Sequence, residues 1–259
     1  MDRPPFWMQT GDFLDYEWSY KTKNERITGF KKEIAEREFW ITVFGNSEAE
    51  YADNWSRIHE VFEKDILNVT PGKLYFGEYC LNCYIFASEK SEWEYDCNMH
   101  DNRYWLVTDR PFWIRESSIT IPTATDPEGD GLYYDYTYDY TYGSSGLSVT
   151  FENEHFAPCN FRLTAHGPFN ALEFAINGNL YRVNQSCAEG EMLILDTSAR
   201  TIVKIDTYGN VWNVFGKQDF TLDNFKQIPA GENILSYGRT YQIDLTIYEE
   251  RSEPKWSAW

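Results

Sequence analysis

The second half of the chain is a succession of short β-rich runs separated by turns, and this pattern restricts the fold more than any other feature. Asn177-Gly178 predicts a tight hairpin, because a type I′ turn requires positive φ at both central positions. Residues 241–248 alternate apolar and polar side chains, as expected of a strand with one buried face. An antiparallel β-sandwich is predicted from the runs at 161–165, 171–176, 180–183, 192–195, 201–205, 211–215, 225–228 and 241–248.

The first part of the chain predicts further strands arranged around one helix. Residues 39–44 are rich in aromatic and β-branched side chains and end at Gly45, which is typical of a strand. Ser47 and Glu50 have the spacing of a capping box at a helix start. We expect the apolar stripe behind this cap to pack on a sheet, with a partner-binding groove as the alternative. The stripe consists of Tyr51, Trp55, Ile58 and Phe62.

Residues 119–147 differ in amino-acid composition from the rest of the chain. We expect them to be the linker between a domain at 1–118 and a domain at 148–259. Proline and glycine are followed by a run in which tyrosine alternates with aspartate or threonine. In an extended chain the alternating tyrosines share one face, and they are Tyr134, Tyr136, Tyr138, Tyr140 and Tyr142. We expect this tyrosine segment to contact the chain's own domains or a neighbouring copy, and a sugar-stacking surface is the alternative.

The last residues predict a second contact site. Glu253-Pro254-Lys255 leads into Trp256, and a proline-stiffened tail that ends in tryptophan is typical of an anchor. The sequence leaves open whether the final strand stays in the sandwich or returns to the first domain.

The charge balance argues against nucleic acid as a partner. The chain carries 41 acidic and 23 basic residues, a formal net charge of -18, whereas phosphate binding needs clustered lysine and arginine. Residues 1–5 lack the basic start and apolar run of a signal peptide, and no apolar stretch approaches the roughly 20 residues of a membrane helix. We therefore expect a chain made in a cytoplasm, with no membrane partner and no sequence-specific nucleic-acid partner.

One cysteine and histidine cluster has the spacing of a zinc site. The candidate ligands are Cys80, Cys83, Cys97 and His100. A regular strand places Cys80 and Cys83 on opposite faces, so ligation requires a turn or bulge between them, and buried core thiols are the alternative. We expect no metal or other cofactor. The run from Asp126 to Gly131 begins like a calcium loop, but Thr137 stands where a bidentate carboxylate is required.

Motifs for catalysis are missing from the sequence. There is no nucleophile elbow, phosphate-binding glycine loop or zinc-protease helix, and the histidines have no recognisable partner spacing. We predict that the chain is not an enzyme and has no catalytic residue. A glycosidase remains the alternative, since it needs only two carboxylates placed by the fold.

Two short motifs, in a fixed order, resemble a known family. Leu106-Val107-Thr108-Asp109-Arg110-Pro111-Phe112-Trp113 closes the first region, and Phe225-x-x-Ile228-Pro229-Ala230-Gly231-x-Asn233 lies late in the second. With the strand–helix region, the tyrosine segment and the sandwich, this layout is similar to the distal tail protein of long-tailed bacteriophages of Gram-positive hosts. The resemblance covers nearly the whole chain.

The resemblance implies a structural virion protein at the distal end of the phage tail. It implies an N-terminal split β-barrel with one helix, six copies of which form a ring, and an outer galectin-like sandwich. The implied partners are the tail tube protein, the tail-tip hub or tail-associated protein, and a receptor-binding or side-fibre protein. No residue is implied to be catalytic. A carbohydrate-binding β-sandwich protein is the alternative function.

Overall fold

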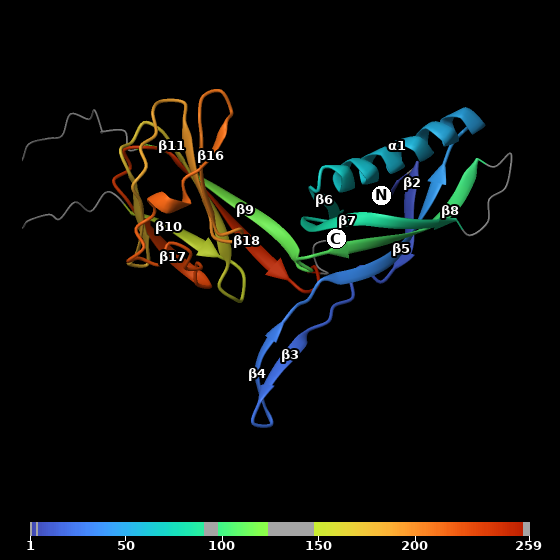
Figure 1. The fold of residues 1–259 in the computed structure, drawn as a ribbon, viewed down its shortest axis with the longest axis horizontal. Helices are drawn as coiled ribbons and strands as arrows, with labels where there is room; N and C mark the ends of the chain where they lie inside the picture. The colour runs from blue at the N-terminus through green and yellow to red at the C-terminus, as the bar shows by residue number, and fades with distance from the viewer. Residues whose placement is uncertain (1, 4, 91–97, 124–147, 256–259) are drawn as a thin grey trace, which may run out of the picture. The chain divides into compact units, whose positions relative to one another are not determined.

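The computed structural model describes residues 2–3, 5–90, 98–123 and 148–255, and it confirms a mainly β fold (Figure 1). The chain divides into two compact units. Unit 1 comprises Met1–Arg115 and Glu250–Trp259, and unit 2 comprises Glu116–Glu249. Unit 2 is therefore an insertion in the chain of unit 1. Within the described residues, none of the helices combines the length and apolar character needed to cross a bilayer.

Unit 1 is built on an antiparallel sheet in the order β1-β2-β5-β8-β7. β7 changes partners along its length: residues 79–83 pair with β6, while residues 84–90 pair with β8. A register shift between Ile85 and Ala87 accompanies this change, as expected where a bulge bends a strand. The elements are β1 (Asp2–Arg3), β2 (Phe6–Gly11), β3 (Ser19–Lys23), β4 (Arg26–Lys31), β5 (Ala35–Phe44), α1 (Glu48–Leu67), β6 (Gly72–Phe76), β7 (Tyr79–Lys90), β8 (Met99–Thr108) and the start of β9 (Trp113–Ile121).

Helix α1 begins where the capping box predicts. The Ser47 hydroxyl accepts a hydrogen bond from the Glu50 backbone N–H, 3.3 Å away. The Glu50 carboxylate reaches back to the N–H of Asn46 rather than to that of Ser47. Both contacts satisfy donors at the helix start that would otherwise lack partners.

The predicted stripe of α1 faces the core of unit 1, which confirms the helix-on-sheet prediction. Ile58 and Phe62 are buried, and Tyr51 and Trp55 pack against the same cluster. The centre of that cluster comes from adjacent strands of the sheet, and its fully buried side chains are Phe39, Ile41, Val43, Tyr104 and Leu106.

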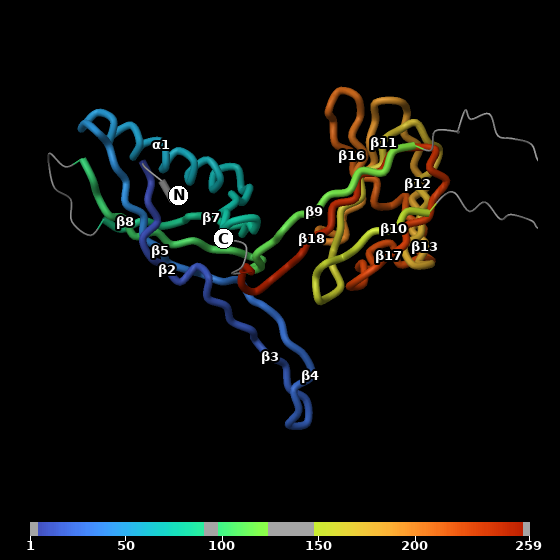
Figure 2. The backbone as a smooth tube through the Cα atoms, turned by 180° about the vertical axis from the view of Figure 1, so that it is seen from behind, coloured from blue at the N-terminus to red at the C-terminus, as the bar shows by residue number. Residues whose placement is uncertain are grey.

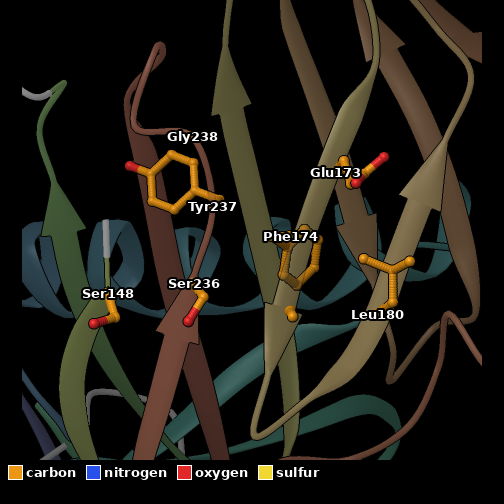
Figure 3. Close-up of a pocket in the computed structure, with 8 residues that line it drawn as sticks. Ser148, Glu173, Phe174, Leu180, Ser236, Tyr237 and Gly238 are labelled. Atoms are coloured by element: carbon orange, nitrogen blue, oxygen red, sulfur yellow. The ribbon is translucent and has the colours of Figure 1, made fainter. Parts of the chain in front are cut away.

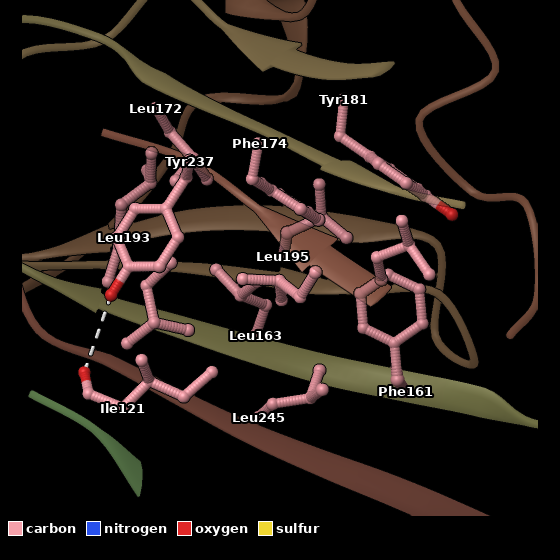
Figure 4. Close-up of a cluster of buried hydrophobic side chains, with 14 of the residues drawn as sticks. Ile121, Phe161, Leu163, Leu172, Phe174, Tyr181, Leu193, Leu195, Tyr237 and Leu245 are labelled. Carbon is pink, nitrogen blue, oxygen red and sulfur yellow. Dashed lines mark hydrogen bonds between the residues drawn. The ribbon is translucent and has the colours of Figure 1, made fainter. Parts of the chain in front are cut away.

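Unit 2 is a sandwich of two antiparallel sheets. One runs β9-β18-β11-β14-β15-β16 and the other runs β10-β17-β12-β13. Phe161 and Leu163 from the first sheet share a core with Phe174 and Tyr181 from the second (Figure 4). The strands are β10 (Ser148–Asn153), β11 (Asn160–His166), β12 (Leu172–Ile176), β13 (Asn179–Val183), β14 (Met192–Asp196), β15 (Thr201–Ile205), β16 (Val211–Asn213), β17 (Gly231–Ser236) and β18 (Ile243–Arg251).

The Asn177-Gly178 turn joins β12 to β13, as predicted. Ile176 pairs with Asn179, and the two residues between them have φ of 48° and 80°. These positive angles are what a type I′ connection requires. The Asn177 side chain also accepts from the Ile234 N–H and donates to Asn233 Oδ1, which ties the turn to β17.

Two of the predicted strands are wrong in extent. Residues 225–228 contribute only an isolated bridge between Ile228 and Cys159, and the strand in this region is β17. The alternation of β17 was hidden from the sequence because polar Asn233, rather than an apolar residue, points into the core beside Leu235. The strand predicted at 211–215 ends at Asn213 and is followed by a 3-10 helix, Phe215–Lys217.

The final strand belongs to both units. β18 begins in the sandwich, and the chain joins unit 1 at Glu250, so residues 250–255 differ from the expected domain range of 148–259. Arg110 binds the Glu250 carboxylate at 2.5 Å, and Trp18 Nε1 donates to Ser252 Oγ. Residues 119–121, expected in the linker, are part of β9.

Candidate interaction surfaces

A two-stranded arm, formed by β3 and β4 and called here the β3–β4 arm, leaves the sheet of unit 1 (Figure 2). Both strands are exposed over almost their whole length. Tyr20 and Phe30 stand directly opposite each other with 64% and 62% of their surfaces exposed, and Ile27 is 58% exposed. An isolated hairpin has no core of its own and is marginally stable in water. Its exposed apolar surface therefore makes the arm a candidate contact site.

The register divides the β3–β4 arm into an apolar face and a basic face. Tyr20 pairs with Phe30, and Thr22 pairs with Ile27, so these side chains share one face. The alternate positions hold all of the arm's basic residues, which are Lys21, Lys23, Arg26 and Lys31. Residues 19–31 carry four basic side chains and one acidic one, in a chain whose remaining residues carry 19 basic and 40 acidic ones. The arm therefore has a net positive charge, whereas the rest of the chain has a net negative charge.

These residues could not be identified from the sequence, because an exposed strand and a half-buried strand can show the same alternation of apolar and polar residues. Tyr20 and Phe30 each stand next to a lysine in the sequence, which is also typical of an apolar position in a half-buried strand. The cluster of lysine and arginine on the other face, in an acidic chain, was the available signal.

The base of the arm is fixed by Lys32, whose ammonium lies among three aromatic rings. Its Nζ is 4.5 Å from the ring centre of Phe112, 5.3 Å from that of Trp18 and 5.6 Å from that of Tyr16. It also donates to the backbone carbonyl of Pro111 at 2.6 Å. Burial, and secondarily the charge of Arg37, lowers the pKa of Lys32 to about 8. Cation–π contacts and the carbonyl hold the charged form in place.

The Pro111-Phe112-Trp113 motif therefore has a structural role. Phe112 packs edge-on against Trp18 at the arm's base. Trp113 points the other way into the core, where it contacts Phe13 and Phe76. The motif joins the arm to the core of unit 1.

The second motif, at residues 225–233, is held by two buried asparagines. Asn153 Nδ2 donates to the carbonyls of Ile228 and Pro229. Asn233 Nδ2 donates to the carbonyls of Pro229 and Gly231, and its Oδ1 accepts from Asn177. These bonds satisfy the polar groups of a turn that lies beside the sandwich core.

An open groove on unit 2, with a volume of about 530 Å³, is lined by residues of β10, β12, β13 and β17 (Figure 3). Glu173 is the one carboxylate among its described lining residues, and its Oε2 accepts from Arg182 Nε at 2.8 Å. A glycosidase needs two carboxylates flanking the bond that it cleaves. The described lining of this groove supplies one, already engaged by an arginine.

The hairpin of β15 and β16 presents a second exposed aromatic surface, on unit 2. Tyr208 is 89% exposed and Trp212 is 59% exposed. The loop between the strands is held by Asp206, whose carboxylate accepts from the Asn210 side chain and from the backbone N–H groups of Tyr208 and Asn210. These hydrogen bonds, with that from the Asn210 side chain first, lower the pKa of Asp206.

The residues predicted as interface candidates lie outside the described part of the chain. This holds for Trp256 and for the tyrosine segment, Tyr134, Tyr136, Tyr138, Tyr140 and Tyr142. Their roles remain predictions. Pro254, two residues before Trp256, is buried.

The structure describes three of the four predicted zinc ligands, since Cys97 lies outside the described residues. Cys80 and Cys83 are both buried in a stretch of β7 that keeps regular register with β6, so no bulge brings the two thiols to one face. His100 packs on Trp55. Burial raises the pKa of Cys83 to about 12, which opposes the thiolate that zinc requires. The described residues contain no group of three metal-binding side chains.

Solved phage structures share this fold. No protein-family model and no curated protein matches the chain. The Dit protein of phage SPP1, described as a paradigm of the hub adsorption apparatus in phages that infect Gram-positive bacteria, has a TM-score of 0.58 and 12% identity, covering 95% of this chain and 93% of that one. A chain of the phage P2 baseplate, in its activated conformation with Ca, has a TM-score of 0.60 and 14% identity, covering 98% and 93%.

The same baseplate with Sr gives a TM-score of 0.59 at 14% identity. The resemblance predicted from the sequence is thereby confirmed at the level of the fold, over nearly the whole chain.

Proposed function

We propose that this chain is a structural subunit of a phage tail tip, six copies of which form a ring between the tail tube and the tip hub. The observation that carries the proposal is a fold shared over at least 95% of the chain with the Dit protein and with the baseplate chain. The likeness spans both units, so the proposal concerns the whole chain rather than one module.

The surfaces of the chain suit this role. The β3–β4 arm exposes apolar side chains that a partner could cover. The described lining of the sandwich groove offers one carboxylate, whereas a glycosidase needs two. The proposed partners are further copies of the chain, the tail tube protein, the tail-tip hub or tail-associated protein, and a receptor-binding or side-fibre protein carried by unit 2. The proposed location is the distal end of the phage tail.

Two measurements test the proposal. The mass in solution is expected to reach about six times 30.5 kDa at high protein concentration. In negative-stain images of the particles, a labelled antibody against the chain is expected at the junction of tube and tip. Label on the capsid or along the whole tube would contradict the proposed location.

Carbohydrate binding is the second candidate, and the β15–β16 hairpin favours it. Aromatic rings held at an exposed position next to polar side chains are suited to stacking on sugar rings, and Tyr208 and Trp212 stand beside Asn210 and Asp206. A glycan array with the wild type and with Trp212→Ala tests this function. Loss of a glycan signal in the variant supports it, whereas the same weak signal in both proteins rules this surface out.

A further inference from the structure

The β3–β4 arm and helix α1 carry complementary features at two different places on unit 1. The arm has a net positive charge and exposes Tyr20, Ile27 and Phe30. Figures 1 and 2 both show it leaving the sheet on the side away from α1. A single copy therefore cannot bring its own arm to its own helix.

The outer side of α1 has the opposite charge. The helix carries six acidic and two basic side chains, and Glu60 and Glu63 are exposed on it. Val61 is 58% exposed one residue after Glu60, and its neighbours one helical turn away are Arg57 and Lys64. Val61 lines a cavity together with the apolar side chains of Ile58 and Phe62, so a partner that covers it removes a continuous apolar surface from water.

A cavity of about 330 Å³ opens at this part of the helix. Its wall combines Phe6 of β2 with Ile58, Val61 and Phe62 of α1, and its rim carries Arg57 and Glu60. The apolar wall is contributed by two elements that already pack together in the unit 1 core, so the cavity is preformed.

We propose that the apolar face of the β3–β4 arm of one copy docks into the α1–β2 cavity of the next copy, with Phe30 as the central contact. The basic face of the arm then stays toward water. Its positive charge attracts the arm, before contact, to the net negative helix α1 of the next copy. Buried aromatic side chains dominate the energy of such contacts, and complementary charge raises the association rate.

The contact is head to tail, because the two complementary surfaces differ. Each copy offers one arm and one cavity, so every copy can be both donor and acceptor. Heterologous contacts of this kind produce a closed ring when the rotation between copies closes, whereas a two-fold contact would stop at a dimer. The inference rests on the proposed ring and identifies the residues that would join its members.

Paired cysteine substitutions test the contact directly. In Phe30→Cys/Val61→Cys, mild oxidation is expected to link successive copies into a ladder of reducible multimers. The controls are the single variant Phe30→Cys, which reports on the native thiols and on arm-to-arm linkage, and Phe30→Cys/Ala52→Cys, which moves the second thiol to another exposed position on the same helix.

The possible outcomes distinguish an error in the proposed contact from an error in the proposed ring. A ladder limited to the Val61 variant supports the contact. If the wild type assembles but the Val61 variant links no more than the Ala52 control, the contact is wrong and the ring stands. Linked dimers from Phe30→Cys alone would show linkage through a second arm or a native thiol and would contradict the contact with Val61. A chain that stays monomeric and unlinked at high concentration would overturn both proposals.

Charge reversal gives an independent readout. Lys21→Glu/Lys23→Glu is expected to weaken self-association about ten-fold at low salt and to flatten its salt dependence, because both lysines lie on the exposed arm. An unchanged salt dependence would contradict electrostatic attraction between arm and helix. Circular dichroism of the variant checks that the fold is intact.

Discussion

Two hairpins in this chain share their local design and differ in their environment. Each has a two-residue turn with positive φ at both positions, at Asn24-Glu25 in the arm and Asn177-Gly178 in the sandwich. Each has an aromatic pair directly across the strands, yet Phe174 and Tyr181 are 1% exposed and stacked with ring centres 4.6 Å apart, whereas Tyr20 and Phe30 are more than 60% exposed. The turn residues and the cross-strand pair specify a hairpin in both places. Burial of the aromatic pair determines whether the hairpin stabilises the fold or leaves an apolar surface exposed to water.

The largest effect is expected from Phe174→Ala in the buried hairpin. Removing a fully buried ring loses its transfer free energy and leaves a cavity, so the sandwich should lose about 3–5 kcal/mol of unfolding free energy. Urea denaturation, with hydrogen exchange of the β12 and β13 amides to locate the change, measures it. A loss below about 1 kcal/mol would mean that this pair is no more structural than the arm's pair.

Asn233→Ala should come next, because it removes the partner of the Asn177 turn. Asn233 is fully buried, and its removal takes a hydrogen bond from the carbonyls of Pro229 and Gly231 and from the Asn177 amide, which should cost about 2 kcal/mol. The comparison is Asn213→Ala, which removes an exposed asparagine of β16 whose Oδ1 accepts from the Phe215 N–H. Equal losses in the two variants would show that the buried network adds nothing to the hairpin.

The turns should respond in opposite directions to exchange of their second residue. Gly178→Ala forces a side chain into positive φ and should cost about 1 kcal/mol, while Glu25→Gly removes such a residue and should stabilise the arm turn by roughly 0.5–1 kcal/mol. Hydrogen exchange at the two turns measures both local changes. Slower exchange in Gly178→Ala would contradict the assigned turn geometry.

The base of the arm should give a smaller, pH-dependent effect. The pKa of Lys32 is lowered from 10.5 to about 8 in the folded chain, so between these values the unfolded chain binds more protons than the folded one. The contribution of Lys32 to stability therefore rises as pH increases from about 8 to about 10.5.

NMR of the Lys32 side chain should show a titration midpoint near 8, raised in Arg37→Gln because a neighbouring positive charge is gone. Lys32→Met should flatten this part of the stability profile. A midpoint near 10 would mean that the aromatic rings and the Pro111 carbonyl offset the cost of burial.

The smallest effect on stability is expected from Phe30→Ala. Its side chain is exposed, so the unfolding free energy should change by less than about 0.5 kcal/mol while self-association is lost. Thermal unfolding and solution mass of the same sample separate the two effects. A loss of 2 kcal/mol or more would make Phe30 a core residue and remove the contrast between the hairpins.

The sequence predicted features whose signal is local. Ser47 and Glu50 mark the start of α1, and Asn177-Gly178 marks a hairpin, because each signal depends on backbone groups within a few residues. β17 escaped prediction because Asn233 occupies a core position through contacts with residues distant in the chain. Nothing in a local pattern reports such contacts.

The candidate site was harder to predict for a related reason. Exposure of Tyr20 and Phe30 is set by what the rest of the chain fails to cover, and one sequence does not state this. The motif around Phe112 was predicted to close the first region, whereas its role in holding Lys32 and the arm needed three-dimensional contacts.

The insertion of unit 2 has a consequence for how such chains can diversify. Its entry strand β9 and exit strand β18 are neighbours, linked by Ser118 with Thr246 and by Thr120 with Asp244. A domain whose two ends lie side by side can be exchanged for another domain with the same distance between its ends, without disturbing the fold of unit 1. We therefore expect that the sandwich can be exchanged, or its surface changed, without altering the residues by which unit 1 would assemble.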